Sequence, residues 1–532
     1  MSEEQKRMLE QQLWNIANTL RGKMDADEFR DYILGFIFFK YLSEKQYIYA
    51  NELLEDEEVT DYRILKDTDA IDAIKEESLE TLGYFLPPCD LFSSVVEKGK
   101  QDKEGEDNFI IADLQRILDE IEQGTMGTDS EEDFNKLFED LDLNSTKLGR
   151  TAEARNEIIA KILSHLDAID FELSNSESDV LGDAYEYLIG KFASGAGKKA
   201  GEFYTPQQVS KVLAKIVTTG KSRLRSVYDP TCGSGSLLLR VGREVEDVAE
   251  YYGQEMNRTT YNLARMNMIL HGVHYSKFDI QQEDTLEYPQ HLDKRFEAVV
   301  ANPPFSAKWK GKDNPLNNTD DRFSQYGKLA PSTKADFAFV QHMVYQLADN
   351  GTMACILPHG VLFRGAAEAA IREYLIKELN CIDAVIGLPA NLFYGTSIPT
   401  CILVVKMCRT SPNDILFIDA SGEGNFVKEG NQNKLTDNNV DDIVKAYRER
   451  KNIDKYAHVA TLAEIEQNDY NLNIPRYVNT FEEEAEIDLS AVAEEYRTVS
   501  DSMVDIDATI AVFCAELGID NPFKAKEVTN EQ

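Results

Sequence analysis

The most informative segment of the sequence is Val227-Tyr228-Asp229-Pro230-Thr231-Cys232-Gly233-Ser234-Gly235-Ser236. It runs from a predicted strand, Ser226–Tyr228, into Leu237-Leu238-Leu239, which predicts the start of a helix. Gly233 and Gly235 allow a tight turn and a close approach of the backbone to a ligand. Backbone amides at the start of a helix can hold an anionic group, here a carboxylate. The segment therefore predicts a ligand-binding loop, although a lone Gly-x-Gly also fits an ordinary turn.

An acidic residue closes the next predicted strand. Glu255 follows Asp229 by 26 positions (255 − 229), a place from which it can accept hydrogen bonds from ribose hydroxyls. This spacing alone leaves a nicotinamide dinucleotide possible. The third glycine of the dinucleotide pattern would fall at Leu238, however, so no pyrophosphate site matches. S-adenosylmethionine, which has a ribose and a carboxylate but no phosphate, fits the loop better.

Short β-rich runs alternate with helical segments from about Leu163 onward. This alternation predicts an α/β fold, with a mostly parallel sheet covered by helices on both faces. The last strands have less helix between them, which suits an antiparallel edge. The predicted strands are Ser226–Tyr228, Ala249–Gln254, Glu297–Ala301, Met353–Leu357, Ile382–Ile386, Ile402–Met407 and Ile415–Ile418. The predicted helices are Pro206–Val217, Ser236–Val245, Thr259–Leu270, Asp336–Leu347 and Ala366–Leu379. Residues 1–170 are expected to be mainly helical, and the chain after Asp441 helical and acidic.

A second motif follows a predicted buried strand. Glu297-Ala298-Val299-Val300-Ala301 runs directly into Asn302-Pro303-Pro304-Phe305. The two prolines end the strand and stiffen the turn, and such a strand end is common without any function. Asn302 would nevertheless lie at the carboxyl edge of the sheet, where open α/β folds bind ligands. The four residues Asn302, Pro303, Pro304 and Phe305 are the candidate catalytic group.

The two motifs, in this order, resemble those of the N6-adenine DNA methyltransferases in which the cofactor motif precedes the catalytic one. The resemblance implies a class I S-adenosylmethionine-dependent methyltransferase sheet, doubly wound and mostly parallel. In that family an upstream motif also contacts the cofactor, and Gly201-Glu202-Phe203-Tyr204-Thr205-Pro206 matches it. Glu283-Asp284-Thr285-Leu286 resembles the segment whose acid lies by the adenine moiety of the cofactor. The implied cofactor-binding residues are Phe203, Tyr204, Thr205, Pro206, Asp229, Thr231, Gly233, Ser234, Gly235, Glu255 and Asp284.

The residue types of the second motif suit methylation of an adenine amine. The N6 lone pair of adenine is delocalised into the ring, which makes the amine a poor nucleophile. The carbonyl groups of Asn302 and Pro303 can accept hydrogen bonds from the amine and direct its lone pair at a methyl sulfonium. Phe305 can stack on a base that has left the duplex.

Further segments resemble the modification subunits of type I restriction–modification systems. They are Leu13-Trp14-Asn15-Ile16-Ala17, Phe29-Arg30-Asp31-Tyr32-Ile33-Leu34 and Asp469-Tyr470-Asn471-Leu472-Asn473-Ile474-Pro475-Arg476-Tyr477. In that family a specificity subunit reads the DNA, two modification subunits clamp it, and an ATP-dependent restriction subunit cleaves. The resemblance implies site-specific methylation that protects host DNA and, with restriction subunits, supports cleavage of foreign DNA. It implies an N-terminal helical domain at 1–160, a catalytic domain at 161–479 and a C-terminal helical tail with partner contacts at 480–532.

The formal net charge of −38 over 532 residues conflicts with unaided DNA binding. Proteins that grip duplex DNA usually present a basic surface, because much of their affinity comes from released phosphate counterions. Either the substrate is not nucleic acid or another subunit supplies the basic groove. The resemblance favours the second explanation, since a specificity subunit would read the bases.

Composition and spacing favour a cytoplasmic chain without a bound metal or membrane contact. The longest uncharged apolar run, around Ile33–Phe39, is far shorter than the ~20 residues that span a bilayer. The seven cysteines form no C-x-x-C pair and read as reduced thiols. His271 and His274 are separated by Gly272, a predicted helix stop, so a metal site is not expected there. Gly195-Ala196-Gly197-Lys198-Lys199 does not satisfy the phosphate-loop pattern and is interpreted as a flexible basic loop.

Three other functions compete with this interpretation. Protein glutamine N5-methyltransferases use a similar Asn-Pro-Pro turn, and an acidic chain suits a protein substrate. A catalytically idle scaffold or DNA mimic could exploit the negative surface, but would not need the Asp229 loop, Glu255 and Asn302 together. A self-sufficient methyltransferase would need a recognition domain, and no basic, aromatic-rich segment of domain size follows Asn302.

Overall fold

The computed structural model describes residues 10–16, 26–100, 109–171, 173, 180–195, 205–393, 396–430, 432–479 and 489–523. The chain divides into two compact units, Met1–Asn479 and Thr480–Gln532. No helix in the described part of the chain combines the length and the apolar character that a membrane crossing requires.

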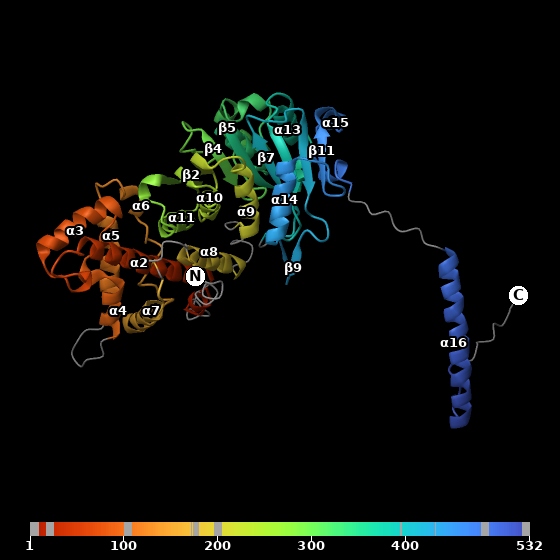
Figure 1. Cartoon of the computed structure of the whole chain (residues 1–532), viewed down its shortest axis with the longest axis horizontal. Coiled ribbons are helices and arrows are strands. Elements are labelled where there is room, and N and C mark those ends of the chain that lie inside the picture. Colours follow the sequence, from red (N-terminus) through yellow and green to blue (C-terminus); the bar gives the residue numbers. More distant parts are fainter. Residues whose placement is uncertain are drawn as a thin grey trace. The chain divides into compact units, whose positions relative to one another are not determined.

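The first unit is built on a nine-stranded sheet with the order β11-β8-β6-β7-β5-β4-β1-β2-β3 (Figure 1). Its strands are β1 (Arg223–Asp229), β2 (Asp247–Glu255), β3 (Phe278–Gln282), β4 (Phe296–Ala301), β5 (Leu347–Pro358), β6 (Ile382–Gly387), β7 (Thr400–Lys406), β8 (Asp414–Asp419) and β11 (Ala457–Thr461). β7 runs antiparallel between β5 and β6, and β11 runs antiparallel to β8 at one edge. The other neighbouring strands pair in parallel. β9 (Val427–Glu429) and β10 (Gln432–Lys434) form a separate hairpin.

β1 is the strand at which the chain changes direction across the sheet. It pairs in parallel with β2 on one side and with β4 on the other. Asp229 lies opposite Gly253 of β2, two residues before Glu255. Tyr228 lies opposite Val299 of β4, three residues before Asn302. The segments after these three strands therefore meet at one carboxyl edge, where doubly wound sheets bind ligands.

Helices cover both faces of the sheet. β4 is buried along its whole length, and its successive side chains enter two different cores: Ala298 and Val300 join one, and Val299 and Ala301 join the other. The first core takes residues from α9 (Gln207–Val217), α10 (Ser236–Gly242), α11 (Arg258–Leu270) and α14 (Asp437–Glu449). The second takes residues from α12 (Asp336–Tyr345), α13 (Ala366–Lys377) and α15 (Leu462–Gln467). This alternation is the physical basis of a doubly wound fold, and it confirms the predicted fold class.

The N-terminal part of the first unit is helical. Residues 10–16 form a short helical stretch. The helices that follow are α2 (Ala26–Leu53), α3 (Thr68–Thr81), α4 (Phe92–Lys100), α5 (Ile111–Gly124), α6 (Glu131–Phe134), α7 (Ala152–Asp167) and α8 (Val180–Gly195) (Figure 1). Their buried side chains belong to the same core as one face of the sheet.

The predicted elements from α9 to β8 are confirmed in type, and their ends differ by a few residues. All seven predicted strands and all five predicted helices of that region exist. Two strands of the main sheet, β3 and β11, were not predicted, and β11 lies where the chain was expected to be helical. The antiparallel edge is present as β11, but β7 places a second antiparallel strand inside the sheet, which was not expected.

The second unit contains one long helix, α16 (Leu489–Leu517). Nine of its apolar residues recur at alternating spacings of three and four, the heptad pattern of helices that pack against other helices. These residues are Leu489, Val492, Tyr496, Val499, Met503, Ile506, Ile510, Phe513 and Leu517. All of them except Ile510 are exposed.

Candidate functional site

A cavity lies at the carboxyl ends of β1, β2 and β4. Segments that are far apart in the sequence contribute to its wall. The residues that line it are Thr205, Asp229, Pro230, Thr231, Cys232, Gly233, Ser234, Ser236, Leu237, Glu255, Met256, Asn257, Asp284, Thr285, Leu286, Asn302, Pro304, Ala307, Lys308, Trp309, Ala335 and Phe339.

The loop after β1 forms one wall of the cavity. Gly233 and Gly235 have positive φ angles of 55° and 77°, which side chains with a Cβ rarely adopt. The carboxyl of Asp229 accepts a hydrogen bond from the Thr231 amide at 2.9 Å. From α11, Asn267 donates to the Ser234 carbonyl at 2.9 Å. The glycines therefore allow the loop to turn, and the side chains of Asp229 and Asn267 hold the turn in shape.

Glu255 holds two backbone segments at once. Its Oε2 accepts from the Gly233 amide at 3.1 Å, and its Oε1 accepts from the Asn257 amide at 2.8 Å. Burial raises the pKa of Glu255 above its ordinary value. Burial also raises the pKa of Asp229 to about 8, and the nearby Glu255 carboxyl adds to that rise. Two buried acids in one cavity favour a ligand that donates hydrogen bonds or carries positive charge.

The segment after β3 forms another part of the wall. Oδ1 of Asp284 accepts from the Leu286 amide at 2.9 Å, and the Thr285 hydroxyl donates to the Pro230 carbonyl at 2.6 Å. The guanidinium of Arg322 donates to the carbonyls of Thr285 and Leu286 at 3.0 and 2.9 Å. This segment is therefore fastened both to the loop after β1 and to the chain beyond β4.

Asn302 brings an unused hydrogen-bond acceptor to the cavity. Its Oδ1 is buried and accepts no hydrogen bond from any described residue. A buried amide oxygen without a partner is costly, and such an atom calls for an explanation in terms of a ligand or a function. Pro304 lines the cavity beside it, whereas Pro303 is buried and Phe305 packs edge-on against Phe393 with ring centroids 5.5 Å apart.

The turn that follows is held by a buried carboxylate. Ser306 has a positive φ of 53°, and its amide donates to Oδ1 of Asp336 at 2.8 Å. Asp336 is 2% exposed and is paired with Arg364, whose Nη1 lies 3.5 Å from its Oδ2. The sequence indicated Asp336 only as the start of a helix, because its partner at Ser306 is 30 residues away.

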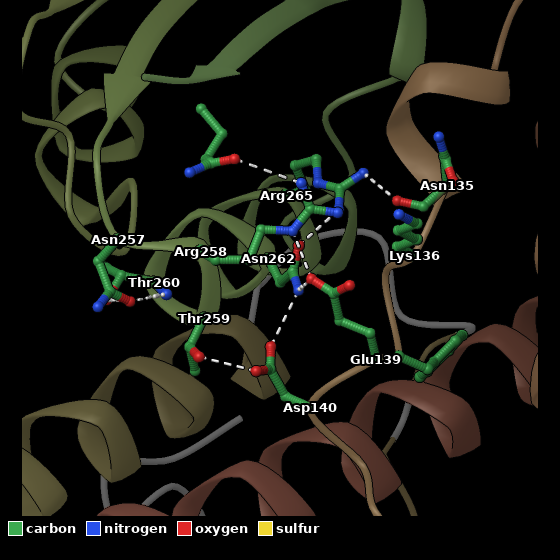
Figure 2. Close-up of polar contacts among 12 residues, drawn as sticks. Asn135, Lys136, Glu139, Asp140, Asn257, Arg258, Thr259, Thr260, Asn262 and Arg265 are labelled. Atoms are coloured by element: carbon green, nitrogen blue, oxygen red, sulfur yellow. Dashed lines mark hydrogen bonds and ion pairs between the residues drawn. The ribbon is translucent and has the colours of Figure 1, made fainter. Parts of the chain in front are cut away.

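The N-terminal helical region contacts α11 through a group of polar side chains (Figure 2). Thr259 donates to Asp140 at 2.7 Å, and Asn262 donates to the same carboxylate at 2.9 Å. Arg265 is 1% exposed, and its Nη1 donates to the Asn135 carbonyl at 3.1 Å and to two further backbone carbonyls. Asn257 is the N-cap of α11, and its amide donates to Glu255. These contacts therefore hold in place the helix whose N-cap binds the Glu255 carboxylate.

The structure brings together most of the residues that the sequence indicated. Those that line the cavity are Thr205, Asp229, Thr231, Gly233, Ser234, Glu255, Asp284, Asn302 and Pro304. Gly235, Pro303 and Phe305 lie next to lining residues without lining the cavity themselves, and Pro206 lines a different cavity. Phe203 and Tyr204, as well as residues 196–199 of the basic loop, lie outside the described residues. Met256, Asn257, Lys308, Trp309 and Phe339 were not predicted, and only their place in the fold reveals them.

Within the described ranges, no group of three or more His, Cys, Asp or Glu side chains could hold a metal ion. The Nδ1 of His271 lies 2.9 Å from the Asn267 carbonyl, and the Nε2 of His274 lies 3.1 Å from the Thr81 carbonyl. All seven cysteines are free.

Two family models match the chain. The model described as N-6 DNA Methylase matches residues 176–486, and the model described as HsdM N-terminal domain matches residues 9–166. The MpnII methylase subunit, a type I restriction enzyme subunit of Mycoplasma pneumoniae, is 38% identical over 534 residues, 97% of each chain. The MjaVIII methylase subunit of Methanocaldococcus jannaschii, also from a type I restriction enzyme, is 31% identical and spans 89% of this chain and 80% of its own. The crystal structure of a type I restriction–modification methyltransferase subunit from Streptococcus thermophilus superposes with a TM-score of 0.81 at 44% identity, covering 90% of this chain and 100% of that one.

The sheet and the cavity at its carboxyl edge define a class I methyltransferase. The chain belongs to the N-6 DNA methylase family, among the methylase subunits of type I restriction enzymes, and its enzyme class is adenine-specific DNA methyltransferase. The likeness to such subunits over nearly the whole chain favours this function over a protein glutamine N5-methyltransferase, an idle scaffold and a self-sufficient enzyme.

Proposed function

We propose that this chain transfers the methyl group of S-adenosylmethionine to the N6 amine of an adenine that has been flipped out of duplex DNA. The observation that carries the proposal is the buried Oδ1 of Asn302, which has no hydrogen-bond partner among the described residues and lies in the same cavity as the Asp229 loop and Glu255. An amide oxygen without a donor from the described part of the chain is suited to accept a hydrogen bond from a substrate amine.

The polar groups of the cavity fit S-adenosylmethionine. When bound, this cofactor supplies an electrophilic methyl sulfonium. We assign Glu255 to its ribose hydroxyls, because Glu255 already stands at the end of β2 with both carboxylate oxygens facing backbone donors. Asp229 and the loop from Thr231 to Gly235 would hold the amino-acid end, and Asp284 the adenine. Thr205 and Pro206, with Phe203 and Tyr204, complete the proposed cofactor set.

The Asn302–Phe305 group would orient the target base. We assign the Asn302 and Pro303 carbonyls to the N6 amine, Pro304 to the stiffness of the turn, and Phe305 to the face of the base. Asp336 supports this arrangement, since it fixes the Ser306 amide directly after the motif. The amine needs no strong base beforehand, because its proton becomes acidic only after the methyl group has been transferred.

We propose that partner subunits determine which DNA site is methylated. A specificity subunit would read the DNA, two modification subunits would serve one specificity subunit, and an ATP-dependent restriction subunit would join for cleavage. The net charge of −38 supports a chain that does not bind DNA unaided. Methylation would protect host DNA, in the cytoplasm.

The C-terminal tail, residues 480–532, is the proposed contact with the specificity subunit. The apolar positions of α16 repeat as in a coiled coil and are largely exposed. The helix carries six acidic residues, Glu494, Glu495, Asp501, Asp505, Asp507 and Glu516, against one basic residue, Arg497. Like charges would oppose pairing of two copies of α16, which favours a different chain as the partner. We divide the remainder into an N-terminal helical domain at 1–160 and a catalytic domain at 161–479.

The test is co-expression of the chain with the product of its neighbouring specificity gene. Transfer of labelled methyl groups from S-adenosylmethionine to N6 of adenine is then measured on duplex DNA, with each subunit alone as a control. Transfer by the complex supports the proposal. Labelling of another base or of protein, or site-specific transfer by the isolated chain, contradicts it.

A further inference from the structure

The segment between β4 and α12 is basic, although the chain as a whole is strongly acidic. Residues 302–335 contain six basic side chains, Lys308, Lys310, Lys312, Arg322, Lys328 and Lys334, and three acidic ones, Asp313, Asp320 and Asp321, for a net charge of +3 (6 − 3). The whole chain has a net charge of −38. Three of the lysines fall within five residues and follow the Asn302 motif directly.

The lysines of this segment are not equivalent. Lys308 is exposed and lines the same cavity as Asn302. Lys312 is also exposed, and neither lysine forms an ion pair or a hydrogen bond with any other described residue. Lys310, by contrast, is paired with Glu287, with Nζ 3.2 Å from Oε2. Lys308 is thus available for a ligand at the cavity, Lys312 is available four residues further along the chain, and Lys310 between them is already paired.

The backbone that carries these lysines is anchored. The Trp309 amide donates to the Ser332 carbonyl at 3.0 Å, and its indole Nε1 donates to the Pro331 carbonyl at 3.1 Å. The Ala335 amide donates to the Ala307 carbonyl at 2.8 Å. Lys308 therefore lies on an anchored stretch of backbone between Ala307 and Trp309, and Lys312 follows in the short 3-10 helix Gly311–Asp313.

We propose that Lys308 and Lys312 bind backbone phosphates of the DNA strand that carries the target adenine. This inference rests on the proposed function. A base that enters the cavity stays covalently attached to its sugar and phosphates, so the phosphates must come to lie at the rim. The ammonium of Lys308 at the cavity, with Lys312 four residues further along the same basic segment, matches the charge of the phosphates, whereas the chain as a whole is acidic.

Such contacts would position the nucleotide without reading its sequence, because phosphate contacts carry no base information. They explain how a chain that delegates recognition can still hold the strand at the site of transfer. The partner would bring the duplex to the enzyme, and this loop would secure the single nucleotide that leaves the helix.

The experiment uses the complex with the specificity subunit and compares Lys308→Ala and Lys312→Ala with Lys310→Ala and Lys445→Ala. Lys445 is an exposed lysine of α14, outside the loop. The apparent affinity for duplex DNA and the KM for DNA are measured between about 50 and 200 mM salt, since each phosphate contact contributes about 0.9 to the slope of log affinity against log salt. Cofactor affinity is measured separately by calorimetry.

Lys308→Ala and Lys312→Ala should each lower that slope by about one and raise the KM for DNA, with a smaller change in kcat. Cofactor affinity should stay at the wild-type value. Lys308→Arg keeps the positive charge and should therefore show the wild-type slope of log DNA affinity against log salt. Slopes equal to the wild type, or equal losses in Lys310→Ala and Lys445→Ala, would overturn the inference. Weaker cofactor binding in Lys308→Ala with an unchanged slope would assign that lysine to the cofactor instead. A wild-type complex that methylates no adenine refutes the proposed function itself, whereas these slope outcomes concern only the loop.

Discussion

The backbone amide of Gly233 donates a hydrogen bond to Oε2 of Glu255 at 3.1 Å, which joins the loop after β1 to the end of β2. The second oxygen of the same carboxylate accepts from Asn257 at the first turn of α11. One side chain therefore joins two walls of the cavity and also lines the cavity itself. A carboxylate in that position can exchange its contacts for ribose hydroxyls without moving.

Glu255→Ala should weaken the binding of S-adenosylmethionine by about 1–3 kcal/mol, because charge-assisted bonds to the ribose are lost. Titration calorimetry on the purified chain measures the change. Glu250→Ala is the control, since Glu250 is exposed and lies on the same strand but outside the cavity. An affinity equal to the wild type would remove Glu255 from the cofactor site.

Asp229 makes the stability of the ligand-free protein depend on pH. Burial raises its pKa from 3.8 to about 8, so the folded state holds the proton more tightly than the unfolded state. The associated stability is complete at acidic pH and is lost as the pH rises from the unfolded value towards about 8. Asp229→Asn cannot ionise, and its melting temperature should fall less than that of the wild type across this window. Differential scanning calorimetry at a series of pH values gives the two curves, and parallel curves would contradict the assignment.

Arg265 lets the N-terminal helical region be tested as a support for α11. Its guanidinium donates to the Asn135 carbonyl and the Asn262 side chain (Figure 2). It also donates to the carbonyls of Glu132 and Asp133. Arg265→Leu would remove the donor from these partly buried acceptors, at a cost of about 1–3 kcal/mol for each group that stays unsatisfied. We expect a lower melting temperature and weaker cofactor binding. Arg258→Gln, which removes a surface ion pair with Glu139, should change stability by no more than about 1 kcal/mol. Equal effects of the two variants would refute a special role for Arg265.

The local motifs of this chain could be predicted from the sequence because each is contiguous. The glycine loop and the Asn302 motif each place their turn residues and side chains within ten positions, and hydrophobic runs mark the strands before them. Buried parallel strands such as β4 have no polar face, which makes them easy to recognise. β3 and β11 are short and partly exposed, with polar side chains along them, so they have no such signal.

Contacts between distant segments could not be predicted. Asp336 acts on Ser306 from 30 positions away, and Asp140 acts on Thr259 from 119 positions away. Lys308 has no pattern that separates it from any surface lysine until the fold places it beside Asn302. The sequence thus indicated most of the motif residues that line the cavity and missed those that hold them in position, because only tertiary structure brings the latter together.

The exposed apolar face of α16 can be tested as the contact with the specificity subunit. Val499→Glu with Ile506→Glu would place two charges on the exposed heptad face, where they would have to be desolvated against a partner helix. Co-purification with the specificity subunit should be lost, while the melting temperature of the purified full-length chain stays unchanged, because these side chains are exposed in it. Glu494→Lys is the matched control, since it changes charge outside the heptad positions. A complex that forms normally with both heptad positions charged would exclude α16 as the contact.

Substitution of Asn302 should separate the rate of methyl transfer from the affinity for the cofactor. Its Oδ1 has no partner among the described residues, so Asn302→Ala removes no hydrogen bond of the protein through that atom, and the fold should tolerate the change. The substrate amine, however, would lose an acceptor aligned with the reaction, and removal of one such group costs about 10²–10³ in kcat. We therefore expect methyl transfer to fall at least about 10²-fold while the cofactor affinity stays near the wild-type value. Asn302→Asp keeps an acceptor at the same place and should retain more activity than Asn302→Ala. Single-turnover transfer to a duplex oligonucleotide, measured beside calorimetric cofactor binding, distinguishes these cases. Wild-type turnover in Asn302→Ala would show that the orphaned oxygen serves some other purpose, because a group that aligns the nucleophile cannot be removed without cost.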